Sequence, residues 1–350
     1  MTRPTEHPGR NVWGKAKHRD AVRSSHSLTK WIWGHKWVVL AVTVRFPWTN
    51  RPWALPVLCV LYTPPEVMRR LGRKHRTTGE LARILTRRML GWFPERRFVL
   101  TGDGQYSTHE MTRFAHAYRT QLTFVGRFYG NANLYDPRPE YFGTGRPRVK
   151  GERQPKPEEL AQTKRGRKTQ VAWYGGGERQ VKLVRGQGHW YKPSFGLVPV
   201  SFVYVEDMEG THRPEYFYSS DPSWSGSAIV GSYVSRWAIE VTFWECKVRL
   251  GLGSPRRFSR LAVERVEPWL MSLYSLVSLI YHQHQTTHSV TIPSWPWYEK
   301  SQPTFSTALS EVRRLIWNEW AFEQPQYVGA VKKLPHDFRD YLLKRLTMAA

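Results

Sequence analysis

The stretch SAIVGSYVSRWAIEVTFWECKVRLGLG, residues 227–253, carries four polar side chains in the spacing Y-x2-R-x3-E-x6-K, namely Tyr233, Arg236, Glu240 and Lys247. On one α-helix, at roughly 100° per residue, these positions fall within an arc of about 60°. The spacing therefore predicts a helix whose polar face holds one carboxylate beside a phenol and two cations. Such a face suits a metal-binding carboxylate that lies against a polyanion.

An apolar stripe is predicted beside this polar face, because a second set of residues recurs at steps of four and three. We expect the stripe to be the packing face of the helix. Glu245 falls on the far side of the stripe, which makes Glu240 rather than Glu245 the predicted metal ligand. The stripe consists of Val230, Val234, Trp237, Val241, Trp244 and Val248.

The composition predicts a folded protein with a polyanionic partner. The 350 residues include 53 Lys and Arg against 28 Asp and Glu, a net charge of +25, and 40% are hydrophobic. Nucleic acid is the first choice of partner, and a basic protein without such a partner is the alternative. The two cysteines, Cys59 and Cys246, exclude a disulfide framework and a zinc cluster, and Cys246 is expected to be a packing residue.

The first 135 residues predict an α/β core. Thr77 or Thr78 is expected to cap one helix, and Ser107 or Thr108 the next. The order strand, strand, helix, strand, helix, strand is typical of a mixed sheet flanked by helices. Apolar, β-rich runs predict the strands at 37–44, 53–62, 97–101 and 122–128.

Changes in composition divide the chain into five parts. The first part, residues 1–34, lacks hydrophobic periodicity. The third, residues 136–219, alternates like antiparallel strands around Gly-rich turns, and the last, residues 291–350, is helical. Helices are expected at about 261–283, 305–320 and 328–346. The parts are a polar basic lead-in at 1–34, the first part of the core at 35–135, a β-rich insertion with a basic Pro/Gly-rich loop at 136–219, the signature helix and the end of the core at 220–290, and a helical region at 291–350.

Asp103 is the second candidate acid. It follows a short apolar strand and stands between Gly102 and Gly104. A carboxylate at the carboxyl end of a strand in an α/β sheet lies where ligands bind, although an Asp that merely closes a turn is an equal alternative. Together with Glu240 it could coordinate Mg²⁺ through oxygen ligands. Arg236 suits bidentate contact with a phosphate.

The signature resembles that of bacterial insertion-sequence transposases whose catalytic domain has a ribonuclease H-like fold. The resemblance extends to WALPVLCVLY (53–62), RFVLTGDGQY (97–106) and the entry to the signature helix, and it covers roughly residues 10–290. It implies a mixed sheet flanked by helices, with a β-rich insertion before the last catalytic helix. It also implies a cytoplasmic protein that is associated with the bacterial nucleoid when bound to DNA.

The resemblance assigns roles to the candidate residues. Asp103 would be the second and Glu240 the third acid of an Asp-Asp-Glu triad, holding two divalent metals, Mg²⁺ or Mn²⁺. Tyr233, Arg236 and Lys247 would hold the transposon end. The implied partners are double-stranded DNA, as terminal repeats and target, and further copies of the chain in a DNA complex.

One departure from the family pattern concerns the first acid, which is expected on the first core strand. No Asp precedes Asp20, and Asp20 lies in a polar stretch without a strand pattern. We therefore expect a truncated or internally restarted transposase with little cleavage activity, unless the start codon is misassigned. The alternatives are a DNA-binding remnant without activity and a basic structural or RNA-associated protein.

For the remaining candidates, an ordinary structural role competes with a functional one. The histidines 282, 284 and 288 are predicted to be a polar helix end rather than a metal site, because their spacing is poor for zinc. Trp173 and Trp190 are expected to pack in the core rather than to stack on an unpaired base. The basic runs Arg69–Arg76 and Lys164–Lys168 are either phosphate contacts or solvated loops.

Overall fold

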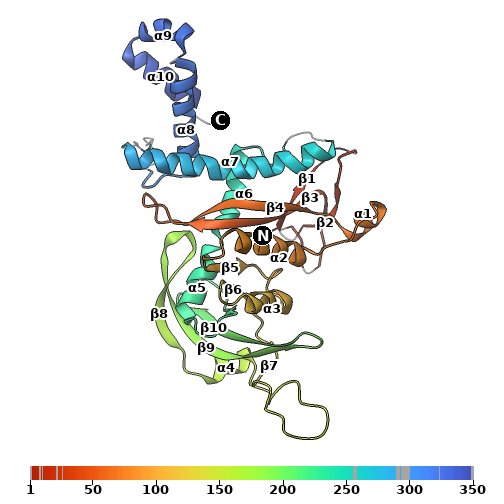
Figure 1. The fold of residues 1–350 in the computed structure, drawn as a ribbon. Coiled ribbons are helices and arrows are strands. Elements are labelled where there is room, and N and C mark those ends of the chain that lie inside the picture. The colour runs from red at the N-terminus through yellow and green to blue at the C-terminus, as the bar shows by residue number, and fades with distance from the viewer. Residues whose placement is uncertain are drawn as a thin grey trace. The chain divides into compact units, whose positions relative to one another are not determined.

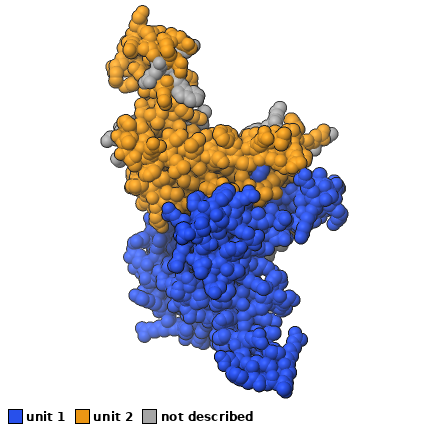
Figure 2. All heavy atoms as spheres, viewed as in Figure 1, with its two compact units in different colours: residues 1–3, 37–40, 62–237 blue, residues 4–36, 41–61, 238–350 orange. Residues whose placement is uncertain are grey.

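The computed structural model describes residues 2–7, 9, 11–20, 23–25, 27–254, 258–288, 292, 300–322 and 324–347. The chain divides into two compact units (Figure 2). Unit 1 comprises residues 1–3, 37–40 and 62–237, and unit 2 comprises residues 4–36, 41–61 and 238–350. One sheet belongs to unit 1 and the other mainly to unit 2.

The sheet of unit 1 is mixed and has the strand order β5-β6-β11-β10-β9-β7, with β8 also paired to β9. β5 and β6 are parallel, whereas the other neighbours are antiparallel, and β9 and β10 form a long hairpin (Figure 1). The strands are β5 (Phe98–Gly102), β6 (Leu122–Arg127), β7 (Leu134–Tyr135), β8 (Arg167–Ala172), β9 (Glu178–Lys192), β10 (Gly196–Asp207) and β11 (Glu215–Ser219).

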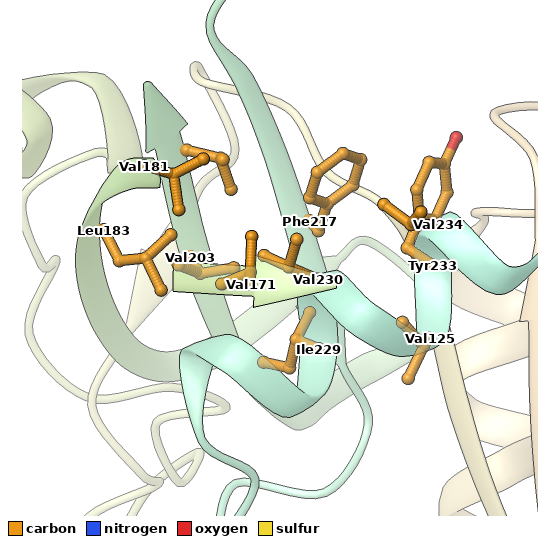
Figure 3. Packing of buried hydrophobic residues seen from close by; sticks show 11 residues of the cluster. Val125, Val171, Val181, Leu183, Val203, Phe217, Ile229, Val230, Tyr233 and Val234 are labelled. Carbon is orange, nitrogen blue, oxygen red and sulfur yellow. The ribbon is translucent and has the colours of Figure 1, made fainter. Parts of the chain in front are cut away.

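Helices α3 (His109–Ala117) and α5 (Gly226–Ser235) cover opposite faces of this sheet. Alternate residues of a strand point to opposite faces. Phe217 packs with α5 in a cluster of buried aliphatic side chains (Figure 3). Its neighbour Tyr218 is bonded through its hydroxyl to Thr112 of α3 at 2.7 Å. The predicted α/β fold, a mixed sheet flanked by helices, is therefore confirmed and is consistent with a ribonuclease H-like fold.

Local sequence signals explain where the helices of unit 1 begin. Thr77 and Glu80 form a capping box at the start of α2 (Thr78–Trp92), and Thr108 caps α3. Both helices were predicted, and the structure selects Thr77 and Thr108 as the caps. The first helix, α1 (Pro65–Arg70), begins at a proline, which suits the first helical position. It includes Arg69 and Arg70, so the start of the basic run that was expected to be a loop is helical. A further short helix, α4 (Pro157–Thr163), also begins at a proline.

The sheet of unit 2 has the order β1-β3-β2, and β4 also pairs with β3. The strands are β1 (Thr2–Glu6), β2 (Ala16–Arg19), β3 (Trp31–Val44) and β4 (Trp53–Tyr62). The prediction of an extended, partly ordered lead-in over residues 1–34 did not specify the strands β1 and β2. These strands are only five and four residues long. Segments this short contain too few alternations to give a sequence signal.

The helices of unit 2 are α6 (Ala238–Arg249), α7 (Arg260–Thr287), α8 (Phe305–Ile316), α9 (Pro325–Lys332) and α10 (His336–Thr347), with a π-helical turn, η2 (Trp317–Phe322), after α8. Two hydroxyls fasten helices to β4: Thr242 of α6 donates to the carbonyl of Ala54 at 2.7 Å, and Ser275 of α7 donates to that of Pro56 at 2.9 Å. The single helix predicted at 328–346 is two helices, because Pro335 disfavours helical geometry at the preceding residue.

The predicted helix over the signature is also divided. α5 ends at Ser235 and α6 begins at Ala238. The amides of Arg236 and Trp237 bond to carbonyls three residues earlier, at 3.1 and 3.0 Å, so the chain tightens into a turn here. The prediction that four signature residues share one continuous helix face is therefore wrong.

The packing role of the apolar stripe is only partly confirmed. Val230 and Val234, on α5, are buried in the core of unit 1. The four later members, Trp237, Val241, Trp244 and Val248, are about half exposed. The buried residues of α6 are instead Ala238, Ile239, Thr242, Phe243, Glu245 and Cys246.

Candidate active site at the carboxyl end of β5

Asp103 directly follows β5, at the edge of the sheet where the parallel strands β5 and β6 both end. Their last paired residues are Gly102 and Gly126. The next positions in this register are Asp103 and Arg127. Two neighbouring parallel strands thus lead to an acid and to a cation at their carboxyl ends, which is where α/β proteins bind ligands.

The loop that carries Asp103 is held by its own hydrogen bonds and by Ser107. The Asp103 carboxylate accepts a bond from the amide of Gln105 at 3.0 Å. The main-chain carbonyl of Asp103 accepts bonds from the amides of Tyr106 and Ser107. The fully buried Ser107 hydroxyl donates to the same carbonyl at 3.0 Å and accepts from the amide of Arg127 at 2.9 Å. Asp103 therefore also performs the turn-closing role that was its alternative interpretation.

Two glycines make room for this loop. A Cβ atom on Gly102 would lie 2.9 Å from the ring of Phe124 and from Cβ of Tyr106. A Cβ atom on Gly126 would collide with the hydroxyl of Ser107. Only residues without a side chain allow the Ser107 hydroxyl to approach the backbone of β6 closely.

Tyr233 brings a phenol to the same region. Its buried ring stacks on Phe217 with the centroids 4.2 Å apart, and its hydroxyl points away from the aliphatic cluster (Figure 3). Arg236 lies over the Tyr233 ring, 5.3 Å from its centroid. Burial raises the pKa of the Tyr233 phenol; Arg236 and Arg127 oppose this effect, whereas the negative charges of Glu215 and Asp103 add to it. The phenol thus stays protonated and can donate a hydrogen bond.

Three residues of this region were missed by sequence reasoning: Arg127, Glu215 and Tyr174. Arg127 forms an ion pair with Glu215. Burial raises the pKa of Tyr174 to about 12, and Glu215 contributes. A signal for Arg127 did exist, since it ends the strand that follows the strand of Asp103. No comparable signal marks the other two, because the antiparallel pairing of β11 with β6 brings Glu215 to the site.

Glu240 and Lys247 belong to unit 2. Glu240 is half buried in the first turn of α6, and Lys247 is exposed in its last turn. Seven residues apart, they lie within about 20° of each other around the helix axis. The structure therefore groups Asp103, Tyr233 and Arg236 in unit 1 and places Glu240 and Lys247 on one helix edge in unit 2. Glu245 is buried beside Arg249, which lies 3.0 Å away, and its burial raises the pKa of its carboxyl group.

No group of three or more His, Cys, Asp or Glu side chains that could hold a metal ion occurs among the described residues. Asp20 directly follows β2, contrary to the expectation that no strand precedes it. It is buried, accepts a bond from the amide of Arg23 at 3.2 Å, and lies in the β2–β3 connection. Asp103 and Glu240 supply oxygen donors of the kind that Mg²⁺ prefers.

The weaker candidates have structural roles. Trp190 packs against Phe128, Tyr218 and His109, as expected from the sequence. Trp173 lines a cavity of about 170 Å³ with Tyr174 and His212, among others. The histidines 284 and 288 stack at the end of α7, and His284 lies 3.0 Å from Glu311 of α8. No helix of the described chain is both long and apolar enough to cross a membrane.

Comparisons with known proteins found a likeness to an endonuclease family in the first part of the chain. The family model for the DDE superfamily endonuclease matches residues 21–180, a region that includes Asp103 but not Tyr233 or Glu240. No curated protein sequence matches the chain. The matched region covers less than half of the chain, and enzymes of this superfamily generally use divalent metals.

Among solved structures, the chain is similar to the piggyBac transposase in a synaptic complex with hairpin DNA. The sequence identity is 13% and the TM-score is 0.44. The alignment covers 100% of this chain and 57% of the piggyBac chain, so this chain spans little more than half the length of that protein.

Proposed function

We propose that the protein is a DNA transposase of an insertion sequence that cleaves phosphodiester bonds at transposon ends and transfers the strand to target DNA. The observation that carries the proposal is the carboxylate of Asp103 at the carboxyl edge of two parallel strands, beside Arg127 and near Tyr233 and Arg236. The endonuclease family match over the region that contains Asp103 supports it.

The side chains around Asp103 have complementary tasks in this proposal. Arg236 and Arg127 each present a planar guanidinium that can bind phosphate oxygens in a bidentate manner. The protonated phenol of Tyr233 donates a hydrogen bond to the same phosphate. In unit 2, Lys247 is the residue proposed to contact the transposon-end backbone as a point charge. Arg127 pairs with Glu215 in the structure. An incoming phosphate can take the place of Glu215 as the partner of Arg127, so DNA binding would replace one ion pair with another.

Asp103 and Glu240 are the proposed ligands of a divalent metal, Mg²⁺ or Mn²⁺. These two carboxylates would hold a metal that would supply activation of the attacking water or 3′-hydroxyl and stabilisation of the leaving oxygen. Two metals would need carboxylates for both ions. The two proposed ligands are fewer than the three acids of an Asp-Asp-Glu set, so we expect weak metal binding and weak turnover.

A second candidate function is DNA binding without cleavage. The net charge of +25 and the exposed cations of the loop after α1 favour it. Arg73, Lys74 and Arg76 are all exposed, and none takes part in an ion pair of the described residues. Such a protein would bind transposon ends and interfere with intact copies by mixed assembly.

The test is a nicking and strand-transfer assay on the cognate terminal repeat, with Mg²⁺ or Mn²⁺. We expect slow nicking that is stronger in Mn²⁺ and is abolished by Asp103→Asn and by Glu240→Gln. Glu209→Gln, at an exposed carboxylate of unit 1, is the control and should leave the rate unchanged.

Each other result of this assay has a distinct meaning. Fast turnover that depends on Asp103 would contradict the proposed impairment. Salt-dependent binding of the repeat without any nicking would favour the remnant. Binding with no preference for the repeat would overturn the transposase proposal in favour of a basic structural or RNA-associated protein.

A further inference from the structure

The outer face of the β2–β3 ladder, within unit 2, carries indoles and cations in alternation with buried residues. Along β3, Trp31 and Trp33 are exposed, whereas Ile32 and Gly34 between and after them are buried. The exposed fractions of the two tryptophans are 53% and 55%. Along β2, the exposed residues are Lys17 and Arg19, and the buried ones are Ala16 and His18. We call Lys15, Lys17, Arg19, Trp31 and Trp33 the indole–cation face.

The register of the two strands places cations directly beside the indoles. Lys17 pairs with Trp33 and Arg19 with Trp31. The ammonium group of Lys17 lies 5.3 Å from the ring centroid of Trp31, and that of Lys15 lies 5.9 Å from the ring centroid of Trp33. These are cation–π distances. A cation therefore lies close to each indole.

The charge of this face is positive. None of the ion pairs of the described residues involves Lys15, Lys17 or Arg19. The nearest carboxylates along the chain, Glu6 and Asp20, both pair with Arg23, at 3.7 and 3.6 Å. Two half-exposed indoles with three cations around them form a surface for a partner that is both aromatic and anionic, which is the chemistry of a nucleotide chain.

We propose that the indole–cation face binds single-stranded DNA by stacking two bases on Trp31 and Trp33 while the cations contact the phosphates. Trp31 and Trp33 are two residues apart on a strand, which separates their backbones by about 6.7 Å. Bases within a duplex strand are only about 3.4 Å apart. Successive bases reach both rings only when they are unstacked, and a duplex keeps its base faces covered.

The choice of DNA over RNA rests on the proposed function, whereas the choice of an unpaired strand rests on the geometry alone. The indole–cation face shares no residue with the proposed catalytic set, since Asp103 follows β5 and Glu240 lies on α6. The protein would therefore bind an unpaired strand even where it cleaves nothing.

The test is fluorescence anisotropy with a labelled oligothymidine of about 15 nucleotides, using the full chain. Trp31→Ala and Trp33→Ala are each expected to weaken binding roughly 5- to 100-fold. Trp33→Phe keeps a stacking ring and should stay within about threefold of the wild type. Trp269→Ala removes an equally exposed indole, 63% exposed on α7, and should change nothing.

Several outcomes would overturn the inference. Unchanged oligothymidine affinity in the Trp31→Ala/Trp33→Ala double variant, with an unaltered circular dichroism spectrum, would remove the stacking role. Equal competition by a duplex of the same length would remove the preference for unpaired bases, and tighter binding of oligouridine would assign the face to RNA. Asp103→Asn should leave oligothymidine binding intact, so a failure of the cleavage assay leaves this test unaffected.

Discussion

Replacing Ser107 with alanine should loosen the loop of Asp103 without removing any proposed catalytic group. The Ser107 hydroxyl is fully buried, donates to the Asp103 carbonyl at 3.0 Å and accepts from the Arg127 amide at 2.9 Å. The Asp103 carbonyl keeps two main-chain donors in the variant, because the amides of residues 106 and 107 are unchanged. The amide of Arg127 loses its acceptor, and an unsatisfied buried donor costs about 1–3 kcal/mol.

The effect is measurable at the Arg127 amide by hydrogen exchange. A local loss of about 2 kcal/mol corresponds to roughly 30-fold faster exchange at this amide. Ser220→Ala is the matched control, because the buried Ser220 hydroxyl accepts from the Phe124 amide of the same strand at 2.8 Å. It should speed exchange at Phe124 by a similar factor and leave Arg127 protected.

The comparison of the two serine variants also has a functional readout. The residual nicking activity should fall in Ser107→Ala and persist in Ser220→Ala, because only the first serine bonds to the Asp103 loop. Unchanged protection of Arg127 in Ser107→Ala would refute the view that this hydroxyl positions Asp103. Equal losses of activity in both variants would show that the effect comes from general destabilisation.

Three further predictions concern residues outside the proposed chemistry. Burial raises the pKa values of Cys59 and Cys246 to about 12, so neither thiol should react with an aromatic disulfide at pH 8 until the protein is unfolded. Burial opposes ionisation of Asp207, but bonds from the amides of Glu209 and His212, from Thr211 and from Arg179 outweigh it and lower its pKa to about 2. The stabilisation by Asp207 is thus complete above its unfolded pKa of about 3.9 and is lost as the pH falls towards 2. In Asp207→Asn, the melting temperature should therefore fall less steeply as the pH is lowered from about 4 to about 2, as measured by thermal melting. Gly126→Ala should destabilise unit 1 by at least about 1 kcal/mol in urea denaturation, because its Cβ collides with the Ser107 hydroxyl.

Elements with strong local signals could be predicted from the sequence. The capping box at Thr77 and the continuous apolar run of β4 depend on neighbours within a few residues, and both occur where they were expected. The same holds for Asp103, whose place after β5 follows from the strand pattern alone. Such features do not depend on how distant segments pack.

Features that depend on distant segments could not be predicted. The turn at Arg236 and Trp237 contains neither glycine nor proline, so no local signal ends the helix there. The approach of Glu215 to Arg127 follows from the antiparallel pairing of β6 with β11, which is the last strand of the insertion. Periodicity likewise could not show that the apolar stripe would be buried on α5 and half exposed on α6.

The division of the signature changes what its spacing can mean. A shared helix face would have explained the intervals between Tyr233, Arg236, Glu240 and Lys247, because side chains on one face can reach one ligand. The structure satisfies this explanation only for Glu240 and Lys247, which lie on one edge of α6. Tyr233 and Arg236 are instead fixed by packing in unit 1, through the stack on Phe217 and the contact between the guanidinium and the ring. The interval between Arg236 and Glu240 therefore spans the turn at residues 236–237 and the start of α6. An added alanine after Trp237 would lengthen that turn without disturbing either helix face, and the proposed chemistry requires that it abolish residual nicking.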